Sequence, residues 1–412
     1  MRTQWFATLA LLVMVTGAMA ADGQGTSAPK APKAPAPASY GSGSSNAMAA
    51  STTAQTRSEQ TFNVGKNSAL DISVSGCEIV IRAWEKNVIE VTVEGLDEED
   101  LEYVKMKQNG DEVTVTYRPK WNTRGGGRFE VSVPSQTKLD MNTSGGNIEL
   151  VGTLSGDAIG HTSGGDITID KIKGTVRMTT SGGDIRTGDI EGKAELRTSG
   201  GNITIANVNG ESTVNTSGGD IRIGNIAKKL DARTSGGDIE VGDIGGDANV
   251  GTSGGDIRVG KVSGNAYLRT AGGDLKLLGA SGTVEARTSG GDIDLKNITG
   301  SIEASTAGGD ITAELNPSGK GESQLKTAGG DIRLWLPASA KASVEATIRI
   351  RDNGGWGGSS KRSKYEVRSD FPSLSYDKDG DRDEIRARYQ LNGGGEVITL
   401  EATNGYIDIK KR

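Results

Sequence analysis

The sequence contains a single cysteine and a single histidine, so neither an internal disulfide framework nor a Cys/His metal site can form. Aromatic residues make up only 4% of the 412 residues and prolines number 9, which excludes a collagen-like chain and an aromatic-rich enzyme core. The 47 basic and 53 acidic residues give a formal net charge of −6. This balance gives no electrostatic case for nucleic-acid binding, so no nucleic-acid partner is predicted.

Glycine, in contrast, is abundant. There are 62 glycines, about twice the ordinary share for a chain of this length. Hydrophobic residues make up 34%, a low proportion, yet they are too regularly placed for a wholly disordered protein. The positions of the glycines along the chain are therefore the main clue to the fold.

The N-terminus is typical of a secretory signal. Arg2 is the positive residue, residues 6–15 form a short apolar run, and Ala18-Met19-Ala20 fits a cleavage site. The run is too short to span a bilayer, which takes about twenty residues, and we expect no membrane span elsewhere. Residues 1–20 are thus predicted to be a signal peptide, and loss of Arg2 takes the charge from −6 to −7. We expect an exported protein, either periplasmic or at the cell surface or secreted.

Residues 21–57 are rich in Ala, Pro, Ser and Gly. Such a segment buries too little apolar area to offset its chain entropy, so we predict a disordered linker. It is either a tether for the folded body or a processed leader.

Eleven near-identical copies of Thr-Ser/Ala-Gly-Gly-Asp/Asn-Ile/Leu dominate the rest of the chain. Their spacings are 19, then eight of 18, then 21, and they begin at Thr143, Thr162, Thr180, Thr198, Thr216, Thr234, Thr252, Thr270, Thr288, Thr306 and Thr327. A fixed period of this length predicts a solenoid, in which each unit buries its apolar face only against its neighbours.

The pattern inside one repeat predicts strands. With the threonine as position 1, apolar residues stand at positions 6, 8, 11, 15 and 17, as in Ile221, Ile223, Ile226, Leu230 and Ala232. Alternation with period two predicts two short strands, at positions 5–8 and 14–1. We therefore predict an all-β fold, a parallel β-helix with coils of about 18 residues, each rising about 4.8 Å around a narrow solid core without a pocket.

Glycine pairs mark one corner of this predicted coil, and a frequent glycine at position 13 marks the opposite one. We expect these corners to need a positive φ, which glycine adopts without a Cβ clash, so that valine at Gly254 would be costly. The regular repeats span 143–337. Irregular coils and a cap are predicted at 58–142 and further coils and a cap at 338–412, because an uncapped stack would grow edge to edge.

The repeated Thr-Ser-Gly-Gly-Asp-Ile resembles the putative adhesin family of bacterial β-strand-repeat proteins, a domain family of unknown function. Residues 369–372, 391–395 and 403–409 resemble the C-terminal part of that family, and residues 79–84 and 113–115 fit its irregular first part. The likeness covers about residues 60–412. It implies a right-handed β-helix exported to the cell envelope, and it implies no activity.

Stacking would place the residues at position 5 in one column: Asn147, Asp166, Asp184, Asn202, Asp220, Asp238, Asp256, Asp274, Asp292, Asp310 and Asp331. Carboxylates about 4.8 Å apart repel one another, so something must compensate. One candidate is Ca²⁺, which favours arrays of oxygen ligands. The favoured candidate is internal ion pairing with the basic columns at position 18 (Arg197, Arg233, Arg269, Arg287, Lys326) and position 7 (Arg186, Arg222, Arg258, Lys276, Arg333). Contact with a polyanion or glycan is a third alternative.

Other residues have simple structural interpretations. The position 1 threonines should point inward and bond to backbone beside the turn. His161 is predicted to be a solvated surface residue, and Cys77 a small buried hydrophobe rather than a reactive thiol. Residues 377–383 are predicted to form a hairpin turn rather than a calcium loop. Trp356 is expected to be either part of a cap or an aromatic that binds a partner. The charged residues are expected to be solvated in loops: 97–100, Arg118, Lys120, Arg124 and Arg128.

No coil carries a unique set of catalytic groups, so no catalytic, cofactor-binding or metal-binding residue is predicted. The favoured function is a non-enzymatic adhesin or surface-display scaffold that acts through its repeated polar ladders, with an envelope polysaccharide or protein as partner. A polysaccharide-active β-helix enzyme is the first alternative, although fold does not transfer function. A regulatory partner in envelope stress is the second. The oligomeric state stays open.

Overall fold

The computed structural model describes residues 56–120, 126–319, 321–351, 364–378 and 383–412. The chain divides into two units, Met1–Thr53 and Ala54–Arg412, and only the second is described below. The predicted signal peptide, nearly all of the linker, Trp356 and Arg124 lie outside the described residues.

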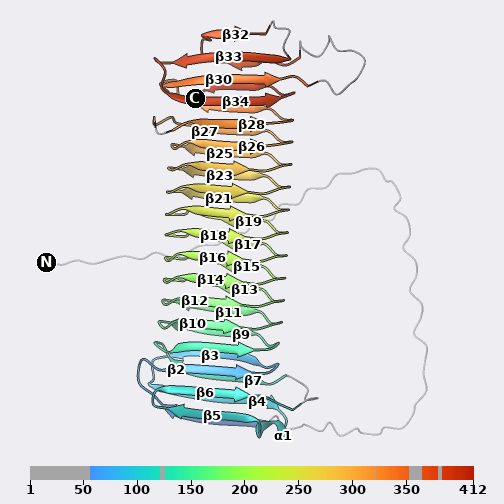
Figure 1. Ribbon diagram of the computed structural model, residues 1–412. Coiled ribbons are helices and arrows are strands. Elements are labelled where there is room, and N and C mark those ends of the chain that lie inside the picture. The colour runs from blue at the N-terminus through green and yellow to red at the C-terminus, as the bar shows by residue number, and fades with distance from the viewer. Residues whose placement is uncertain (1–55, 121–125, 320, 352–363, 379–382) are drawn as a thin grey trace, which may run out of the picture. The chain divides into compact units, whose positions relative to one another are not determined.

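Two long sheets make up this unit, and each coil of the chain contributes a strand to both (Figure 1). In order of pairing, sheet A contains β1 (Thr56–Asn63), β4 (Val88–Leu96), β7 (Arg128–Pro134), β3 (Glu78–Trp84), β9 (Ile148–Leu154), β11 (Ile167–Ile172), β13 (Ile185–Thr187), β15 (Ile203–Ile205), β17 (Ile221–Ile223), β19 (Ile239–Val241), β21 (Ile257–Val262), β23 (Leu275–Ala280), β25 (Ile293–Ile298), β27 (Ile311–Leu315), β29 (Ile332–Leu336), β35 (Ile407–Lys411) and β31 (Val367–Ser369).

Sheet B contains, in the same sense, β5 (Val104–Asn109), β6 (Glu112–Tyr117), β2 (Ala69–Val74), β8 (Lys138–Thr143), β10 (Ala158–His161), β12 (Val176–Thr179), β14 (Ala194–Arg197), β16 (Ser212–Asn215), β18 (Leu230–Arg233), β20 (Ala248–Gly251), β22 (Ala266–Arg269), β24 (Val284–Arg287), β26 (Ile302–Thr306), β28 (Ser323–Thr327), β34 (Glu396–Thr403), β30 (Ala342–Arg349), β33 (Glu384–Leu391) and β32 (Ser375–Asp377).

The repeat folds as its apolar pattern predicts. In the coil of β17 and β18, strands occupy positions 6–8 and 15–18, and position 11 adds an isolated parallel bridge to the coils on either side. Each residue pairs with its equivalent 18 residues away, as Ile221 does with Ile203 and Ile239. The parallel β-solenoid is thereby confirmed.

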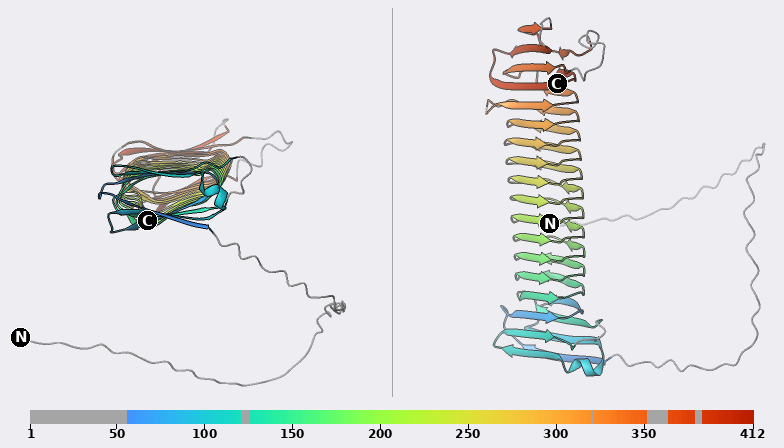
Figure 2. Two further views of the ribbon diagram at one scale, coloured as in Figure 1. Left: turned by 90° about the horizontal axis from the view of Figure 1, so that it is seen from below. Right: turned by 45° about the vertical axis from the view of Figure 1, so that its right-hand side comes forward.

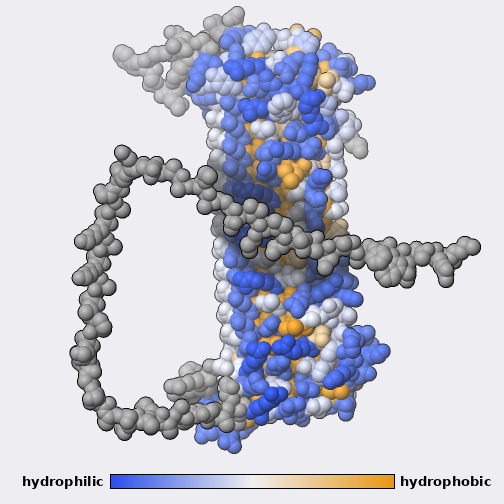
Figure 3. All heavy atoms as spheres, turned by 180° about the vertical axis from the view of Figure 1, so that it is seen from behind, coloured by the Kyte–Doolittle hydropathy of each residue, from blue (hydrophilic) through white to orange (hydrophobic). Residues whose placement is uncertain are grey.

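The core is a stack of small and aliphatic side chains between the two sheets. Ile221, Leu230 and Ala232 are each 0% exposed, and equivalent residues are buried in the neighbouring coils. Viewed along the stack, successive coils superpose, and the two sheets face each other across a narrow interior (Figure 2). The surface seen from behind is mostly hydrophilic, with hydrophobic residues visible in an interrupted strip between hydrophilic columns (Figure 3). The expectation of a solid core holds, but open grooves lie on the surface.

The ends of the stack do not follow chain order. Strands β2 and β3 lie between the coil of β6 and β7 and the first regular strands, β8 and β9. At the other end, β34 and β35 pair directly with β28 and β29, while the earlier strand β30 lies one layer further out (Figure 1). The segment of β2 and β3 and the C-terminal segment of β34 and β35 are thus inserted into the stack.

Antiparallel pairs end both sheets at the N-terminal end of the stack and end sheet B at the other, where the last strand of sheet A, β31, pairs in parallel with β35. β1 pairs with β4 and β5 with β6 at one end, whereas β33 pairs with both β30 and β32 at the other. These antiparallel pairs end the register of parallel coils, which is the role expected of caps. The pairing of β32 with β33 also agrees with a hairpin at 377–383, although residues 379–382 lie outside the described part.

One sequence expectation about charged loops is wrong. Part of the acidic run forms a short helix, α1 (Glu98–Leu101), because acidic residues are favoured in the first turn of a helix. Asp100 of this helix is buried rather than solvated. Arg128 belongs to strand β7 and pairs with Glu78 at 3.1 Å rather than standing in a loop.

The reason for the corner glycines also differs from the expectation. No corner glycine of the regular repeats in the described coils has a positive φ. The constraint is instead the neighbouring coil: a Cβ on Gly255 would lie 2.2 Å from the carbonyl oxygen of Gly237. At Gly254, the first glycine of the same pair, the nearest atom would be the Gly236 carbonyl oxygen at 3.2 Å. The second glycine is therefore required for stacking, whereas the first has nearly enough room for a methyl group.

We expect Gly255→Ala to lower the free energy of unfolding by about 2–3 kcal/mol or more, because backbone of one coil must move away from the next. Gly254→Ala serves as the matched control and should cost less than about 1 kcal/mol. Denaturant unfolding followed by circular dichroism measures both. Equal losses for the two variants would contradict the stacking argument.

Candidate functional site

A continuous ladder of side chains runs along position 5. One oxygen of each Asp or Asn accepts the backbone N–H of the position 5 residue in the next coil, as Asp238 Oδ1 does from Asp256 N at 2.8 Å. The same bond recurs at Asn147, Asp166, Asp184, Asn202, Asp220, Asp256, Asp274, Asp292 and Asp310. The ladder is thus a structural feature that ties successive coils together.

The second carboxylate oxygen is neutralised in part of the ladder by the arginine at position 7. Arg222 bonds Asp220 Oδ2 at 2.8 Å and Arg258 bonds Asp256 Oδ2 at 2.7 Å, because residues two apart in a strand share one face. Arg186 pairs in the same way with Asp184 at 2.5 Å. The predicted pairing with position 7 is confirmed in these three coils.

The predicted pairing with position 18 is wrong. The position 18 arginines stand on sheet B, away from the Asp ladder, and Arg197, Arg233 and Arg287 pair there with carboxylates at position 16. Arg197 contacts Glu195 at 3.2 Å, and Arg233 contacts Asp231 at 2.5 Å. The sequence alone did not separate the two columns, because which outward positions share a sheet depends on where the coil turns.

The position 1 threonines point inward, as predicted. Thr216 is 6% exposed, and its hydroxyl donates to the Gly201 carbonyl of the preceding coil at 2.8 Å. The same oxygen lies 3.4 Å from the Gly219 nitrogen of its own coil and accepts that N–H. Each threonine from Thr162 to Thr327 bonds in this way to backbone groups of two coils at the glycine corner.

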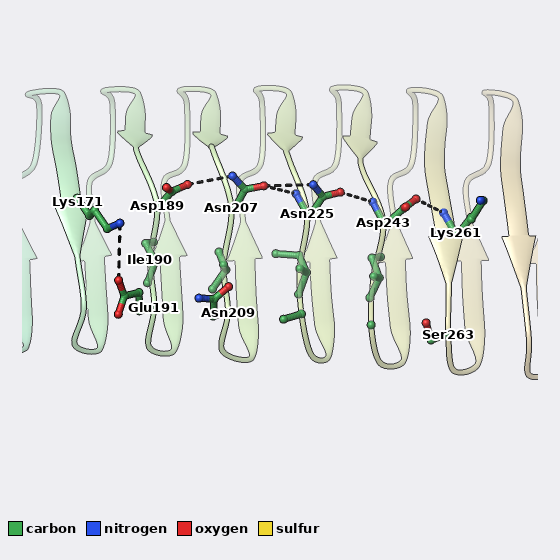
Figure 4. A pocket seen from close by; sticks show the side chains of 15 residues that line it. Lys171, Asp189, Ile190, Glu191, Asn207, Asn209, Asn225, Asp243, Lys261 and Ser263 are labelled. Atoms are coloured by element: carbon green, nitrogen blue, oxygen red, sulfur yellow. Dashed lines mark hydrogen bonds and ion pairs between the residues drawn. The ribbon is translucent and has the colours of Figure 1, made fainter. Parts of the chain in front are cut away.

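A surface groove of about 580 Å³, which we call the amide groove, runs across several coils (Figure 4). One wall is a second ladder at position 10, in which Asn207 Nδ2 donates to Asp189 Oδ1 at 2.9 Å and Asn225 Oδ1 accepts from Asp243 N at 2.9 Å. The floor is the aliphatic column at position 11, and the other wall is position 12, which includes Ala227.

The amide groove has a local sequence cause that the repeat pattern alone does not reveal. Four successive coils carry a small residue followed by Asp or Asn at positions 9 and 10: Gly188-Asp189, Ala206-Asn207, Gly224-Asn225 and Gly242-Asp243. In these coils β13, β15, β17 and β19 have only three residues each. In the coils of β11, β21, β23 and β25, without this pair, the strand continues for six residues. The pair therefore interrupts the strand and opens the groove.

A second groove, which we call the arginine groove, lies at the edge of the outer face of sheet B and also measures about 580 Å³. Three arginines of position 18 line it together with serine and threonine side chains, and its lining includes no carboxylate: Arg233, Thr234, Gly251, Thr252, Ser253, Arg269, Thr270, Ala271, Arg287, Thr288, Ser289 and Ser305.

The remaining candidates have structural roles. Cys77 is buried, and burial raises the pKa of its thiol, so the small hydrophobe interpretation is confirmed. His161 is exposed on β10, as predicted. In the described part of the chain, no group of three or more His, Cys, Asp or Glu side chains is arranged to hold a metal ion.

Like charges meet on sheet B near the first regular coil. Asp71 pairs in register with Asp140, and partial burial together with the negative charges of Asp140 and Glu112 raises the pKa of Asp71. A raised folded-state pKa means that ionisation of Asp71 opposes folding, so stability is lost as the pH rises through that pKa.

For the position 5 ladder, Asp238→Asn should preserve stability, because the side-chain oxygen remains and a charge between two carboxylates is removed. Asp238→Ala should lower the free energy of unfolding by about 1 kcal/mol, since Asp256 N loses its acceptor. Denaturant unfolding of both variants measures the difference. Equal free energies of unfolding for the alanine and asparagine variants would show that the hydrogen bond to the next coil does not stabilise the stack.

For the like-charge pair, Asp71→Asn should stabilise the protein at pH 7 and have little effect at a pH low enough to protonate the wild-type carboxyl. Thermal midpoints across pH 3–8 provide the measurement. Asp231→Asn is the matched control, and it should be destabilising at pH 7 because it removes the ion pair with Arg233. A stabilising effect of Asp71→Asn that does not change with pH would contradict this account.

No helix in the described ranges is both long enough and apolar enough to cross a membrane. Among curated proteins, none matches this sequence. Solved structures that match this chain include a "putative cell adhesion protein" from Clostridium sporogenes, at 10% identity over 87% of this chain and 100% of that chain, with a TM-score of 0.18. Two "putative adhesins" come from Parabacteroides distasonis (12% identity, 63% and 97% covered, TM-score 0.26) and Parabacteroides merdae (14%, 68% and 92%, TM-score 0.25). The identities and TM-scores are too low to assign a function.

A family model gives a firmer result. The model described as Toastrack DUF4097 matches residues 67–242 and 227–352. These matches together span residues 67–352, well over half of the 412 residues, and include every regular coil that carries the ladders and both grooves. The resemblance seen in the repeats is confirmed, and the chain belongs to the Toastrack DUF4097 family.

Proposed function

We propose that this protein is an exported, non-enzymatic scaffold that binds an extended envelope polymer lengthwise. The observation that carries the proposal is the amide groove, which runs parallel to the stacking direction over successive coils (Figure 4). An extended ligand lying in it would meet a similar set of groups in each coil. Weak contacts repeated in this way add up to useful affinity without any deep pocket.

The chemistry of the amide groove suits a polar polymer. Its floor is aliphatic but almost fully buried, so it shapes the groove and exposes little apolar area to a ligand. Each floor residue is 1% exposed: Ile190, Val208, Ile226 and Ile244. Its walls present amide and carboxylate groups, and Lys171 pairs with Glu191 at 3.7 Å near one end. Hydroxyl-rich chains such as glycans offer the donors and acceptors that such walls bind.

The arrangement of the carboxylates supports a role without catalysis. Glycoside hydrolysis uses two carboxyl groups on either side of one bond, with different protonation states. The position 5 carboxylates instead form one row, and each uses an oxygen to accept a backbone N–H of the next coil. The signal-like residues 1–20 support export of the protein to the envelope.

The test is co-sedimentation of the purified protein with peptidoglycan sacculi and with insoluble envelope polysaccharide. Ala227→Trp places a large ring on an exposed position of the groove wall and should reduce binding at least about tenfold, because it blocks the path of the ligand. Thr204→Trp is the matched control: Thr204 is exposed on the outer face of sheet A and does not line the groove.

Equal binding by the wild type and Ala227→Trp would overturn the amide groove as the binding surface. Failure of the wild type to bind any envelope polymer would overturn the proposed function itself. Mass spectrometry of the protein from its envelope fraction should find a chain that starts at Ala21 if the export prediction is right.

A further inference from the structure

Arg269 departs from the pairing rule of the outer face of sheet B. Elsewhere in this column, the arginine at position 18 contacts a carboxylate two residues before it, as Arg197 does with Glu195 and Arg233 with Asp231. In strand β22 that position holds Tyr267. Among the described residues Arg269 has no ion-pair or hydrogen-bond partner for its side chain, so its guanidinium is exposed to solvent with all its donors free.

The neighbouring coils do not neutralise Arg269 either. On one side its register partner is Gly251, which has no side chain, and on the other it is Arg287. Arg287 is itself held by Glu285 and by Glu303, the latter at 2.5 Å. The absence of a side chain at Gly251 leaves a notch in the column between Arg233 and Arg269, and this notch lies in the arginine groove.

The groups around the notch favour a particular ligand chemistry. A free guanidinium binds a planar or tetrahedral anion through two parallel hydrogen bonds. The Tyr267 ring stands on the same face of β22, with 43% of the residue exposed, and offers a flat surface for the apolar face of a sugar ring. The exposed serines Ser253 and Ser289 add hydroxyls along the rim.

A peptide strand would be bound less well here. The two neighbouring strands of sheet B, β20 and β24, already pair with β22 along its whole length. No free sheet edge remains in the groove for a peptide backbone to pair with, so recognition has to use side chains. The coil rise of about 4.8 Å is also close to the length of one sugar residue in an extended glycan.

We infer that the arginine groove binds an acidic glycan, with one carboxylate or sulfate on Arg269 and the adjoining sugar ring against Tyr267. This site lies on sheet B, uses no residue of the amide groove, and does not depend on the function proposed for that groove. It differs from the amide groove in the charge of its ligand: the lining contains three arginines and no carboxylate.

Isothermal titration at low ionic strength tests the inference with defined probes. Oligogalacturonate supplies carboxylates, dextran sulfate supplies sulfates, neutral dextran is the uncharged control, and poly-glutamate represents an acidic peptide. The wild type should bind at least one anionic glycan, more weakly as salt is added, and should not bind neutral dextran. The stronger of the two anionic glycans identifies the group that Arg269 takes.

Three variants locate the site. Arg269→Gln should weaken glycan binding about tenfold. Tyr267→Glu should weaken it by a similar factor, because it supplies the carboxylate that Glu195 gives to Arg197 and so occupies Arg269 internally. Arg197→Gln is the matched control, an arginine of the same column outside the groove, and should change affinity by less than about twofold. All three side chains are largely on the surface, so unchanged thermal midpoints should confirm folding.

Several outcomes would overturn the inference. The first is no heat with either anionic glycan. The second is an equal loss in Arg197→Gln and Arg269→Gln, which would indicate attraction to the surface in general. The third is tighter binding of poly-glutamate than of either glycan, which would make the partner an acidic peptide. Ala227→Trp should leave the binding of oligogalacturonate and dextran sulfate unchanged. The experiment therefore distinguishes a failure of the acidic-glycan inference for the arginine groove from a failure of the function proposed for the amide groove.

Discussion

The close approach of each coil to the next is the constraint on which the rest of the structure depends. At the position 4 corner, the carbonyl oxygen of one coil lies where a side chain of the next would begin, as with Gly237 and Gly255. Only glycine leaves room for this contact. The threonine hydroxyl and the position 5 Asx oxygen then satisfy backbone N–H and C=O groups that the tight corner leaves outside the sheet ladders. The glycine turn, the side-chain hydrogen bonds beside it and the register of the strands thus all follow from the short distance between successive coils.

This constraint also shapes the surface chemistry. Since every coil has the same register, any outward position becomes a column, and a single departure from the repeat creates a local feature. Gly251 at position 18 leaves a notch in the arginine column of sheet B, and Tyr267 at position 16 leaves Arg269 beside it without a carboxylate. The small-Asx pairs at positions 9 and 10 shorten four strands and open the amide groove. Candidate binding surfaces in this protein arise where the repeat is broken, while the repeated residues themselves mainly hold the coils together.

Much of the fold could be predicted from particular residues. The period-two pattern of Ile221 to Ala232 placed two strands per coil, and the inward threonine followed from the same alternation. The insertion of the end coils could not be predicted. Val74-Ser75-Gly76-Cys77-Glu78-Ile79 and Ala402-Thr403-Asn404-Gly405-Tyr406-Ile407 occupy repeat positions in the stack, as shown by Val74 pairing with Thr143 and Ala402 with Thr327. Each segment keeps too few residues of the Thr-Ser-Gly-Gly-Asp-Ile motif to be identified as a repeat. The motif is relaxed there because an end coil has an irregular neighbour on one side. Cys77 illustrates this relaxation, as it stands where every regular coil has its second glycine.

The sequence by itself determined the parallel solenoid, its coil length and its inward residues, since these depend on a periodicity that every coil repeats and on burial that alternates along each strand. Only the tertiary structure decided which outward residues meet. Position 7 faces the Asp ladder and position 18 faces position 16, because the turn at the glycine corner sends the two columns to different sheets. The same holds for the order of the coils at both ends, where long-range pairing between β28 and β34, or between β2 and β8, replaces chain order. Contacts between residues far apart in the chain depend on the path of the backbone, and local sequence patterns do not encode that path.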